Sequence, residues 1–396
     1  MNGSAVCMKI MTAMYTIKRG GAYDRFLLML EAFVEKGCHV HCLSLTPIPI
    51  DHPLYSNHVV SSPLRARTGF VAKVLVFALF PFYLLVLGWR ERVDLIVAFG
   101  PLYAFLQALP KWVLKKTMVT FVRSDLSSRP RASQGNSWIT LPSRLVDRIG
   151  VLCSDRIITN NMASREKIIV MVGRRRERQV SVLYNNIPPI PRPSRETISY
   201  ERRVLGIPDD GKLLVTAGVV TPGKNFELLL RSLSRGGMTN VFLAIVGDGT
   251  TGADFVYRDQ LKGLAKELDI RKKLFFTGWL KKDRVWQIFR ASDLFVLPSL
   301  SEGMPNVLLE ALGCEVACFG SNIPGIRDIL RHETLMFDPD DDKGLTEKLG
   351  RFFSDEDYRR RIMQLCYEQR EKFSFDWKER VFVEVTKQKK CTESQE

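Results

Sequence analysis

The chain has 396 residues, of which 45% are hydrophobic and 26% charged, a composition typical of folded globular proteins. This length predicts two domains of about 150 to 200 residues each. The net charge of +15 indicates an anionic partner, such as a nucleotide or an anionic membrane surface. Nucleic acid is disfavoured because the chain has neither zinc-ligand spacing nor an RNP-type aromatic motif.

The eight cysteines predict neither a disulfide framework nor a zinc site. Two pairs have C-x3-C spacing, Cys38/Cys42 and Cys314/Cys318, but both lie in or beside strand-like runs without a second ligand pair. We recognise no signal peptide, and therefore expect reduced thiols in a cytosolic protein.

The first half of the chain alternates strands and helices, as a doubly wound sheet requires. Helices are expected at 22–36 and 102–114, and strands at 6–12, 40–45, 94–100, 117–122 and 155–160. A Gly-Gly turn joins the first strand to the first helix. Ligand contacts are expected at the carboxyl ends of such strands.

The most apolar run of the chain is 74–89, which contains no charged residue. It is shorter than the roughly 20 residues of a membrane-spanning helix, and Pro81 interrupts it. A span would also place strands of one sheet on opposite sides of a bilayer. Two interpretations remain: a helix buried against the sheet, or a helix with one apolar face exposed for shallow membrane contact.

The second half follows a stretch rich in Pro and Arg at 186–203, which favours an interdomain linker. Helices are expected at 225–233, 259–268 and 283–290, a turn at 323–328, a helical region to about 372 and a last helix beyond Phe373. The expected strands lie at 213–217, 241–246, 274–277, 294–297 and 316–319. The acidic runs at 338–342 and 355–357 are interpreted as helix caps and solvated loops rather than metal ligands.

The most informative motif is the stretch 299–313, which follows the apolar strand 294–297 and opens into a helical pattern. Glu302 precedes the expected helix, and Glu310 lies two turns into it. A helix N-terminus leaves backbone N–H groups that bind phosphate. The two carboxylates are suited to accept hydrogen bonds from sugar and ribose hydroxyls.

This stretch resembles the Glu-x7-Glu signature of the family 4 retaining glycosyltransferases. The resemblance implies an α/β GT-B fold, with two Rossmann-like doubly wound domains facing each other across a cleft. Residues 1–190 would form the acceptor-binding domain, with 375–396 packing back on it. Residues 191–374 would bind the nucleotide sugar. The resemblance is strongest over 213–330 and looser over 1–190.

The family pattern also assigns roles to residues of this chain. Glu310 would bind the ribose, Glu302 the sugar hydroxyls, and Lys224 with backbone N–H groups of 304–307 the diphosphate. The backbone of Leu280 would contact the base. The other residues expected at the donor are Gly303, Met304, Pro305, Asn306, Val307, Gly20, Gly21, Gly223 and Asn225.

The chain departs from the family pattern at Val219, where a second cation for the diphosphate, an arginine, is usual. We expect Lys18, Arg19 or Arg327 to substitute for it, or the activity to be reduced or altered.

Arg123 stands where relatives often place a histidine near the transferred sugar. It cannot act as a base because a guanidinium stays protonated. Its expected role is binding a phosphate, the alternative being an ion pair with Asp125.

The resemblance thus implies a transferase that moves a sugar, with retention, from a nucleotide-diphosphate sugar to a hydroxyl of a glycan or polyprenyl- or other lipid-linked acceptor. Such reactions serve the synthesis of cell-surface polysaccharides and glycolipids. We expect no metal and no cofactor, and a cytoplasmic protein peripheral to the membrane. Two alternatives stay open: a non-catalytic sugar-nucleotide-binding subunit, and a GT-B epimerase or hydrolase.

Overall fold

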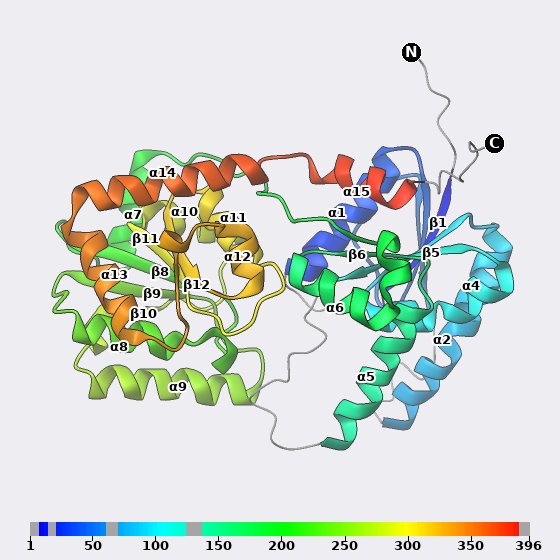
Figure 1. The fold of residues 1–396 in the computed structure, drawn as a ribbon, viewed down its shortest axis with the longest axis horizontal. Coiled ribbons are helices and arrows are strands. Elements are labelled where there is room, and N and C mark those ends of the chain that lie inside the picture. Colours follow the sequence, from blue (N-terminus) through cyan, green and yellow to red (C-terminus); the bar gives the residue numbers. More distant parts are fainter. Residues whose placement is uncertain (1–7, 15–20, 61–69, 124–136, 388–396) are drawn as a thin grey trace, which may run out of the picture. The chain divides into compact units, whose positions relative to one another are not determined.

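The computed structural model describes residues 8–14, 21–60, 70–123 and 137–387. The chain forms two compact units (Figure 1). Of the described residues, those up to 184 and those from 376 onward form the N-terminal unit, and 185–375 form the C-terminal unit.

The N-terminal unit is built on a seven-stranded parallel sheet with the order β3-β2-β1-β4-β5-β6-β7. Its strands are β1 (Lys9–Met14), β2 (His39–Ser44), β3 (Tyr55–Val59), β4 (Leu95–Phe99), β5 (Thr117–Val122), β6 (Arg156–Thr159) and β7 (Val180–Val182). Its helices are α1 (Gly21–Glu35), α2 (Phe70–Glu91), α3 (Pro101–Leu106), α4 (Ala108–Leu114), α5 (Ser137–Leu152), α6 (Met162–Val172), the 3₁₀ helix η2 (Arg174–Gln179) and α15 (Trp377–Thr386).

The C-terminal unit has a six-stranded parallel sheet with the order β10-β9-β8-β11-β12-β13. Its strands are β8 (Lys212–Ala217), β9 (Val241–Val246), β10 (Leu274–Phe276), β11 (Leu294–Leu297), β12 (Ala317–Ser321) and β13 (Met336–Phe337). Its helices are α7 (Arg195–Val204), α8 (Phe226–Arg235), α9 (Gly252–Glu267), α10 (Lys282–Ala291), α11 (Asn306–Gly313), α12 (Pro324–Leu330), α13 (Asp342–Ser354) and α14 (Glu356–Phe373), with 3₁₀ turns η3 (Pro222–Lys224), η4 (Arg271–Lys273) and η5 (Glu333–Leu335).

Both sheets reverse their strand order once, which makes each unit doubly wound as predicted. The chain winds outward from β8 through β9 to β10, and then returns to place β11 on the other side of β8. The β1/β4 pair is the same switch point in the N-terminal unit. Loops that follow the two central strands diverge at a switch point, and leave a crevice in which ligands bind in open α/β sheets.

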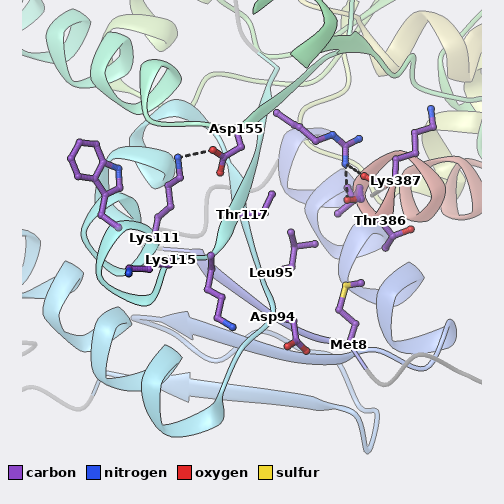
Figure 2. A pocket seen from close by; sticks show the side chains of 13 residues that line it. Met8, Asp94, Leu95, Lys111, Lys115, Thr117, Asp155, Thr386 and Lys387 are labelled. Atoms are coloured by element: carbon purple, nitrogen blue, oxygen red, sulfur yellow. Dashed lines mark hydrogen bonds and ion pairs between the residues drawn. The ribbon is translucent and has the colours of Figure 1, made fainter. Parts of the chain in front are cut away.

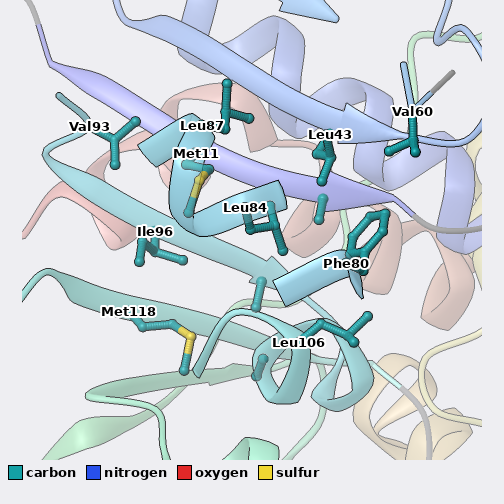
Figure 3. Close-up of a cluster of buried hydrophobic side chains, with 13 residues drawn as sticks. Met11, Leu43, Val60, Phe80, Leu84, Leu87, Val93, Ile96, Leu106 and Met118 are labelled. Carbon is teal, nitrogen blue, oxygen red and sulfur yellow. The ribbon is translucent and has the colours of Figure 1, made fainter. Parts of the chain in front are cut away.

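Helix α2 has two apolar faces. Phe80, Leu84 and Leu87 are buried against a cluster that includes Met11 and Leu43 of the sheet (Figure 3). Other apolar side chains of α2 are exposed, with relative exposures of 57% for Phe82, 60% for Val86 and 73% for Trp89. The strands before and after α2 belong to one sheet, as we expected when rejecting a membrane span. Within the described ranges, no helix combines the length and hydropathy that crossing a bilayer requires.

The structure corrects several predicted elements. Helix α2 is longer than the run 74–89, and 102–114 forms two helices that part at Gln107. The expected linker 186–203 contains α7, because Ser194 caps a helix by accepting the Thr197 N–H. The predicted turn 323–328 lies in α12 instead, since Pro324 suits a first helical position.

Other elements were not predicted, namely β3, β7, β13, α5 and α6. Strand β3 was missed because its residues are all half-buried and polar side chains dominate it, so it lacks the apolar run of a central strand. The interpretation of the aspartates is confirmed for Asp341 and Asp355, which cap α13 and α14.

The C-terminal helix α15 packs on α1 in the N-terminal unit. Trp377 is buried, with the guanidinium of Arg25 lying 5.3 Å from its ring centre. Lys378 Nζ forms ion pairs with Glu31 at 2.9 Å and Glu35 at 2.6 Å. Helix α15 therefore completes the unit that contains β1 and α1.

Close packing between α3 and α5 gives a test of this fold. A Cβ at Gly150 would lie 2.1 Å from the carbonyl oxygen of Pro101. We expect Gly150→Ala to destabilise the N-terminal unit by about 1–3 kcal/mol through overpacking. In Gly263→Ala the new Cβ meets nothing within 4 Å, so stability should rise by about 0.5–1 kcal/mol. Thermal unfolding measures both, and similar shifts in the two variants would contradict the α3–α5 packing.

Candidate functional site

An ion pair lies at the switch point of the C-terminal unit. Lys224 is at the end of η3 in the loop after β8, and Glu302 is in the loop after β11. Lys224 Nζ lies 2.5 Å from Glu302 Oε1, and the two side chains are only 20% and 15% exposed. The structure therefore joins two residues for which the sequence predicted separate roles.

The neighbours of Glu302 fix this geometry. The hydroxyl of buried Ser299 donates to Glu302 Oε1 at 2.8 Å. The Leu300 N–H donates to the Gly223 carbonyl oxygen at 2.9 Å, and so ties the loop after β11 to the loop after β8. Ser299 was not predicted as a site residue, because only the fold reveals that its hydroxyl meets this carboxylate.

Two glycines let the backbone come close to the lysine. Gly218 has a φ of +146°, and a Cβ there would lie 3.1 Å from Cε of Lys224. A Cβ at Gly247 would lie 2.1 Å from the Gly218 carbonyl oxygen. Asn225 follows the lysine in the left-handed region, with φ 53°, and its Nδ2 donates to the Pro339 carbonyl oxygen. Side chains at either glycine would displace the loop or Lys224.

The N-terminus of α11 lies directly after Glu302 in the chain. Pro305 is its N-cap, and no side chain caps the helix. Pro305 has no N–H, so it shapes this terminus and cannot donate to a phosphate, unlike Asn306 and Val307. The Met304 side chain is buried, and its sulfur accepts the Asn185 N–H at 3.1 Å.

Gly303 is also in close contact with the fold. A Cβ at Gly325, in the first turn of α12, would lie 2.2 Å from the Gly303 carbonyl oxygen. The backbone of the Glu302 loop is thus packed closely against the first turn of α12.

Glu310 is on α11 and interacts with the first turns of α10. Lys282 Nζ lies 3.3 Å from Glu310 Oε1, and Trp286 Nε1 donates to Oε2 at 3.4 Å. The carboxylate is 13% exposed. Neither partner was found from the sequence, because Lys282 and Trp286 are spaced as ordinary positions of an amphipathic helix.

Leu280 lines a cavity of about 830 Å³ along the edge strand β10. Asp248 and Gly278 line the same cavity, next to the carboxyl ends of β9 and β10. Asp248 is paired with Arg258 at 2.9 Å. The cavity therefore extends from Leu280, the predicted base-contacting position, to the loops that follow β9 and β10.

In the N-terminal unit, Arg123 follows β5, and its guanidinium lies 5.3 Å from the ring centre of Phe99. Burial, and secondarily the charge of Arg25, lower the pKa of Arg123 to about 9, which leaves it protonated at neutral pH. Gly21 begins α1, whereas Gly20 lies outside the described residues.

The candidates to replace the arginine missing at Val219 are only partly described. Lys18 and Arg19 lie outside the described residues. Arg327 is exposed on α12, and its Nε donates to Asn322 Oδ1 at 3.0 Å.

A second cavity, of about 620 Å³, lies at the opposite edge of the N-terminal sheet (Figure 2). It is lined at the amino ends of β4, β5 and β6 by Leu95, Thr117 and Arg156. Lys111 points across it to Asp155 at 2.9 Å. Its position away from the carboxyl ends separates it from the ligand crevice expected for this sheet.

Part of the chain is similar in sequence to known glycosyltransferases. Residues 197–368 match the family described as glycosyl transferases group 1. An uncharacterized glycosyltransferase of Methanocaldococcus jannaschii is 28% identical over 231 residues, which are 56% of this chain and 57% of that protein. The lipopolysaccharide core biosynthesis glycosyltransferase LpsD of Rhizobium meliloti is 29% identical over 207 residues, 52% of this chain and 54% of LpsD. The chain therefore matches little more than half the length of these relatives.

Solved structures match over nearly the whole chain. Anabaena HepE in complex with UDP-glucose superposes with a TM-score of 0.74 at 19% identity, covering 96% of this chain and 99% of HepE. WaaG, a glycosyltransferase involved in lipopolysaccharide biosynthesis, has a TM-score of 0.71 at 14% identity, covering 96% and 100%. The chain therefore has the GT-B fold, and its C-terminal unit matches the glycosyl transferases group 1 family over residues 197–368.

Proposed function

We propose that this chain is a retaining glycosyltransferase of family 4 that transfers a sugar from a nucleotide-diphosphate sugar to an acceptor hydroxyl. The observation that carries the proposal is the Lys224–Glu302 pair at the switch point, followed at once by α11 and by Glu310 on the same helix. The relatives support it, since those above are named glycosyltransferases and HepE was solved with UDP-glucose.

In the proposed donor complex, Lys224 and the N–H groups at the start of α11 bind the diphosphate. Glu302 accepts hydrogen bonds from the sugar, and Glu310 accepts them from the ribose. The base lies near the backbone of Leu280, beside the cavity along β10.

Charge stabilisation would supply most of the catalysis. As the bond to the sugar breaks, negative charge grows on the diphosphate, where Lys224 and the α11 dipole stabilise it. Arg123, charged at neutral pH, would bind a phosphate of the acceptor or of the donor. A phosphate oxygen of the donor would receive the acceptor proton, as in the mechanism that the resemblance implies, so the step requires no metal ion or cofactor.

One observation favours the alternative of a non-catalytic sugar-nucleotide-binding subunit. Val219 supplies no cation beside Gly218, and Arg327 already binds Asn322. A protein of this kind would bind the nucleotide through Glu310 without turning over, so binding and turnover must be measured separately.

We further propose a glycan or lipid-linked acceptor of cell-surface polysaccharide synthesis, reached from the cytoplasmic face of a membrane. The exposed face of α2 carries Phe82, Val86 and Trp89. A Cβ at Gly88 would lie 2.7 Å from Leu114, so α4 packs closely here, and its exposed Trp112 adds a third aromatic ring. One relative, of Escherichia coli, is named as acting on a diphosphoundecaprenol-linked sugar and is 31% identical over 34% of each chain.

Nucleotide binding tests the role of Glu310. Glu310→Ala should weaken binding of UDP or GDP about ten- to hundredfold, because a charge-assisted hydrogen bond to the ribose is lost. Isothermal titration calorimetry measures this loss, with Glu356→Ala on the exposed surface of α14 as the control. Unchanged affinity of the Glu310 variant, with the control also unchanged, would remove Glu310 from the site.

Turnover tests the role of Lys224. Lys224→Ala should lower kcat about a hundredfold or more, with a smaller effect on KM, because charge on the leaving diphosphate is no longer stabilised. Gly218→Ala should lower kcat in the same direction by displacing the lysine, whereas Gly252→Ala, whose Cβ would meet nothing within 4 Å, should not. Nucleotide release from a panel of UDP- and GDP-sugars with glycan and polyprenyl-linked acceptors gives the rates. Wild-type turnover in Lys224→Ala would assign this role to another cation.

Flotation with liposomes tests the membrane contact. Binding should rise with the fraction of anionic lipid and fall with salt, because Arg90 and Arg92 adjoin the exposed face of α2. Val86→Asp should reduce binding about tenfold or more, since one valine side chain is worth about 1.5–3 kcal/mol on burial. Val170→Asp, at an 83% exposed valine of α6, is the matched control. Equal binding by both variants would show that the α2 face does not enter the membrane.

A further inference from the structure

A polar cluster lies where the apolar interface beneath α2 ends. Leu43 of β2 and Val60, just after β3, belong to the buried cluster under α2. His41 and His58 lie two residues before them in the two neighbouring strands, and therefore on the same side of the sheet. Glu91, the last residue of α2, meets these two imidazoles.

The three side chains converge closely. His41 Nδ1 and His58 Nε2 are 3.3 Å apart. One ligand atom from each of His41, His58 and Glu91 lies within 4.8 Å of the others. His41 is more than nine-tenths buried, and its Nε2 has no hydrogen-bond partner among the described residues.

This spacing suits a shared metal ion better than a direct hydrogen bond. The separation of the two nitrogens is at the long limit for a hydrogen bond, beyond the usual 2.9–3.0 Å or so. Two nitrogens bound to one zinc ion at about 2.0–2.1 Å, with a tetrahedral angle between them, stand about 3.3–3.4 Å apart. Two imidazoles and one carboxylate are also a donor set typical of zinc with three protein ligands.

Nearby cations leave the carboxylate able to bind an ion. Both contacts of Arg90 with Glu91 reach Oε1, at 2.8 Å, and so do not engage Oε2. Lys9 Nζ donates to the backbone carbonyl of Glu91 at 3.1 Å. The positive charges of Arg90 and Lys9 repel a divalent ion and so lower the affinity of the site. The measured affinity therefore tests whether the three ligands outweigh this repulsion.

We propose that His41, His58 and Glu91 form a binding site for a divalent transition-metal ion, with zinc as the best match. Water would complete the coordination. The ion would tie β2, β3 and the end of α2 together, and so stabilise the N-terminal unit. The site uses none of the residues proposed for the donor, so a test of metal binding does not depend on the proposed transferase activity.

Metal binding by the full chain, freed of any histidine tag and stripped with a chelator, tests the site. After dialysis against zinc, we expect one bound equivalent by elemental analysis and a higher Tm, because an ion that binds only the native state stabilises it. Cobalt(II) should give the visible spectrum of a tetrahedral site without a thiolate charge-transfer band. His58→Gln and Glu91→Gln should each weaken binding at least about tenfold, within the range seen when metal sites lose ordering contacts.

His332→Asn is the matched control, because it removes a histidine of the C-terminal unit yet keeps an acceptor for the Thr334 N–H. It should bind one equivalent with wild-type affinity. If His58→Gln fails to fold, Glu91→Gln decides, since this side chain ends a helix and is 24% exposed. Absence of a bound equivalent, wild-type affinity in Glu91→Gln, or a thiolate band from the cysteines would overturn the proposal.

Discussion

The ion pair between Lys224 and Glu302 is the central interaction of the C-terminal unit. It joins the loops after β8 and β11, which diverge because the strand order reverses between these two strands. Removing two charges from water is costly, and a buried pair persists only when its remaining hydrogen bonds are satisfied. Here the Ser299 hydroxyl and the backbone bond from Leu300 to Gly223 provide that support. The loop that leads into α11 is thereby held next to a cation, an arrangement suited to the diphosphate of the proposed donor.

Close backbone approach is the second condition for this site. Gly218, Gly247 and Gly325 each lie where a Cβ would meet another backbone or the site lysine. The loops after β8 and β9 can therefore pack on one another, and the first turn of α12 can pack on the loop after β11. Glu310 is held by Lys282 and Trp286, and in the proposed donor complex a ribose would compete with them for its carboxylate.

The N-terminal unit depends on a different constraint, because helix α2 has one apolar face in the core and another apolar face in solvent. The buried face of α2 completes the core through Phe80, Leu84 and Leu87, and its other face leaves large apolar side chains in solvent. At its last residue the helix meets two imidazoles of the sheet instead of further aliphatic side chains. Core packing, the proposed membrane-contact face and the proposed metal site thus all involve one helix.

By itself, the sequence determined the central strands, the doubly wound class and the local motif with Glu302 and Glu310, because apolar runs and a strand–loop–helix pattern are local properties. It also identified Lys224 as a candidate phosphate-binding cation, because this lysine follows a predicted strand. Only the tertiary structure decided that Lys224 meets Glu302, that Lys282 and Trp286 hold Glu310, and that His41, His58 and Glu91 converge. These contacts join residues 17 to 78 positions apart, and they arise from strand order and helix packing, which no local pattern encodes. The edge strand β3 could not be predicted for a related reason. It is a strand because it pairs with β2, and its own sequence has few apolar residues.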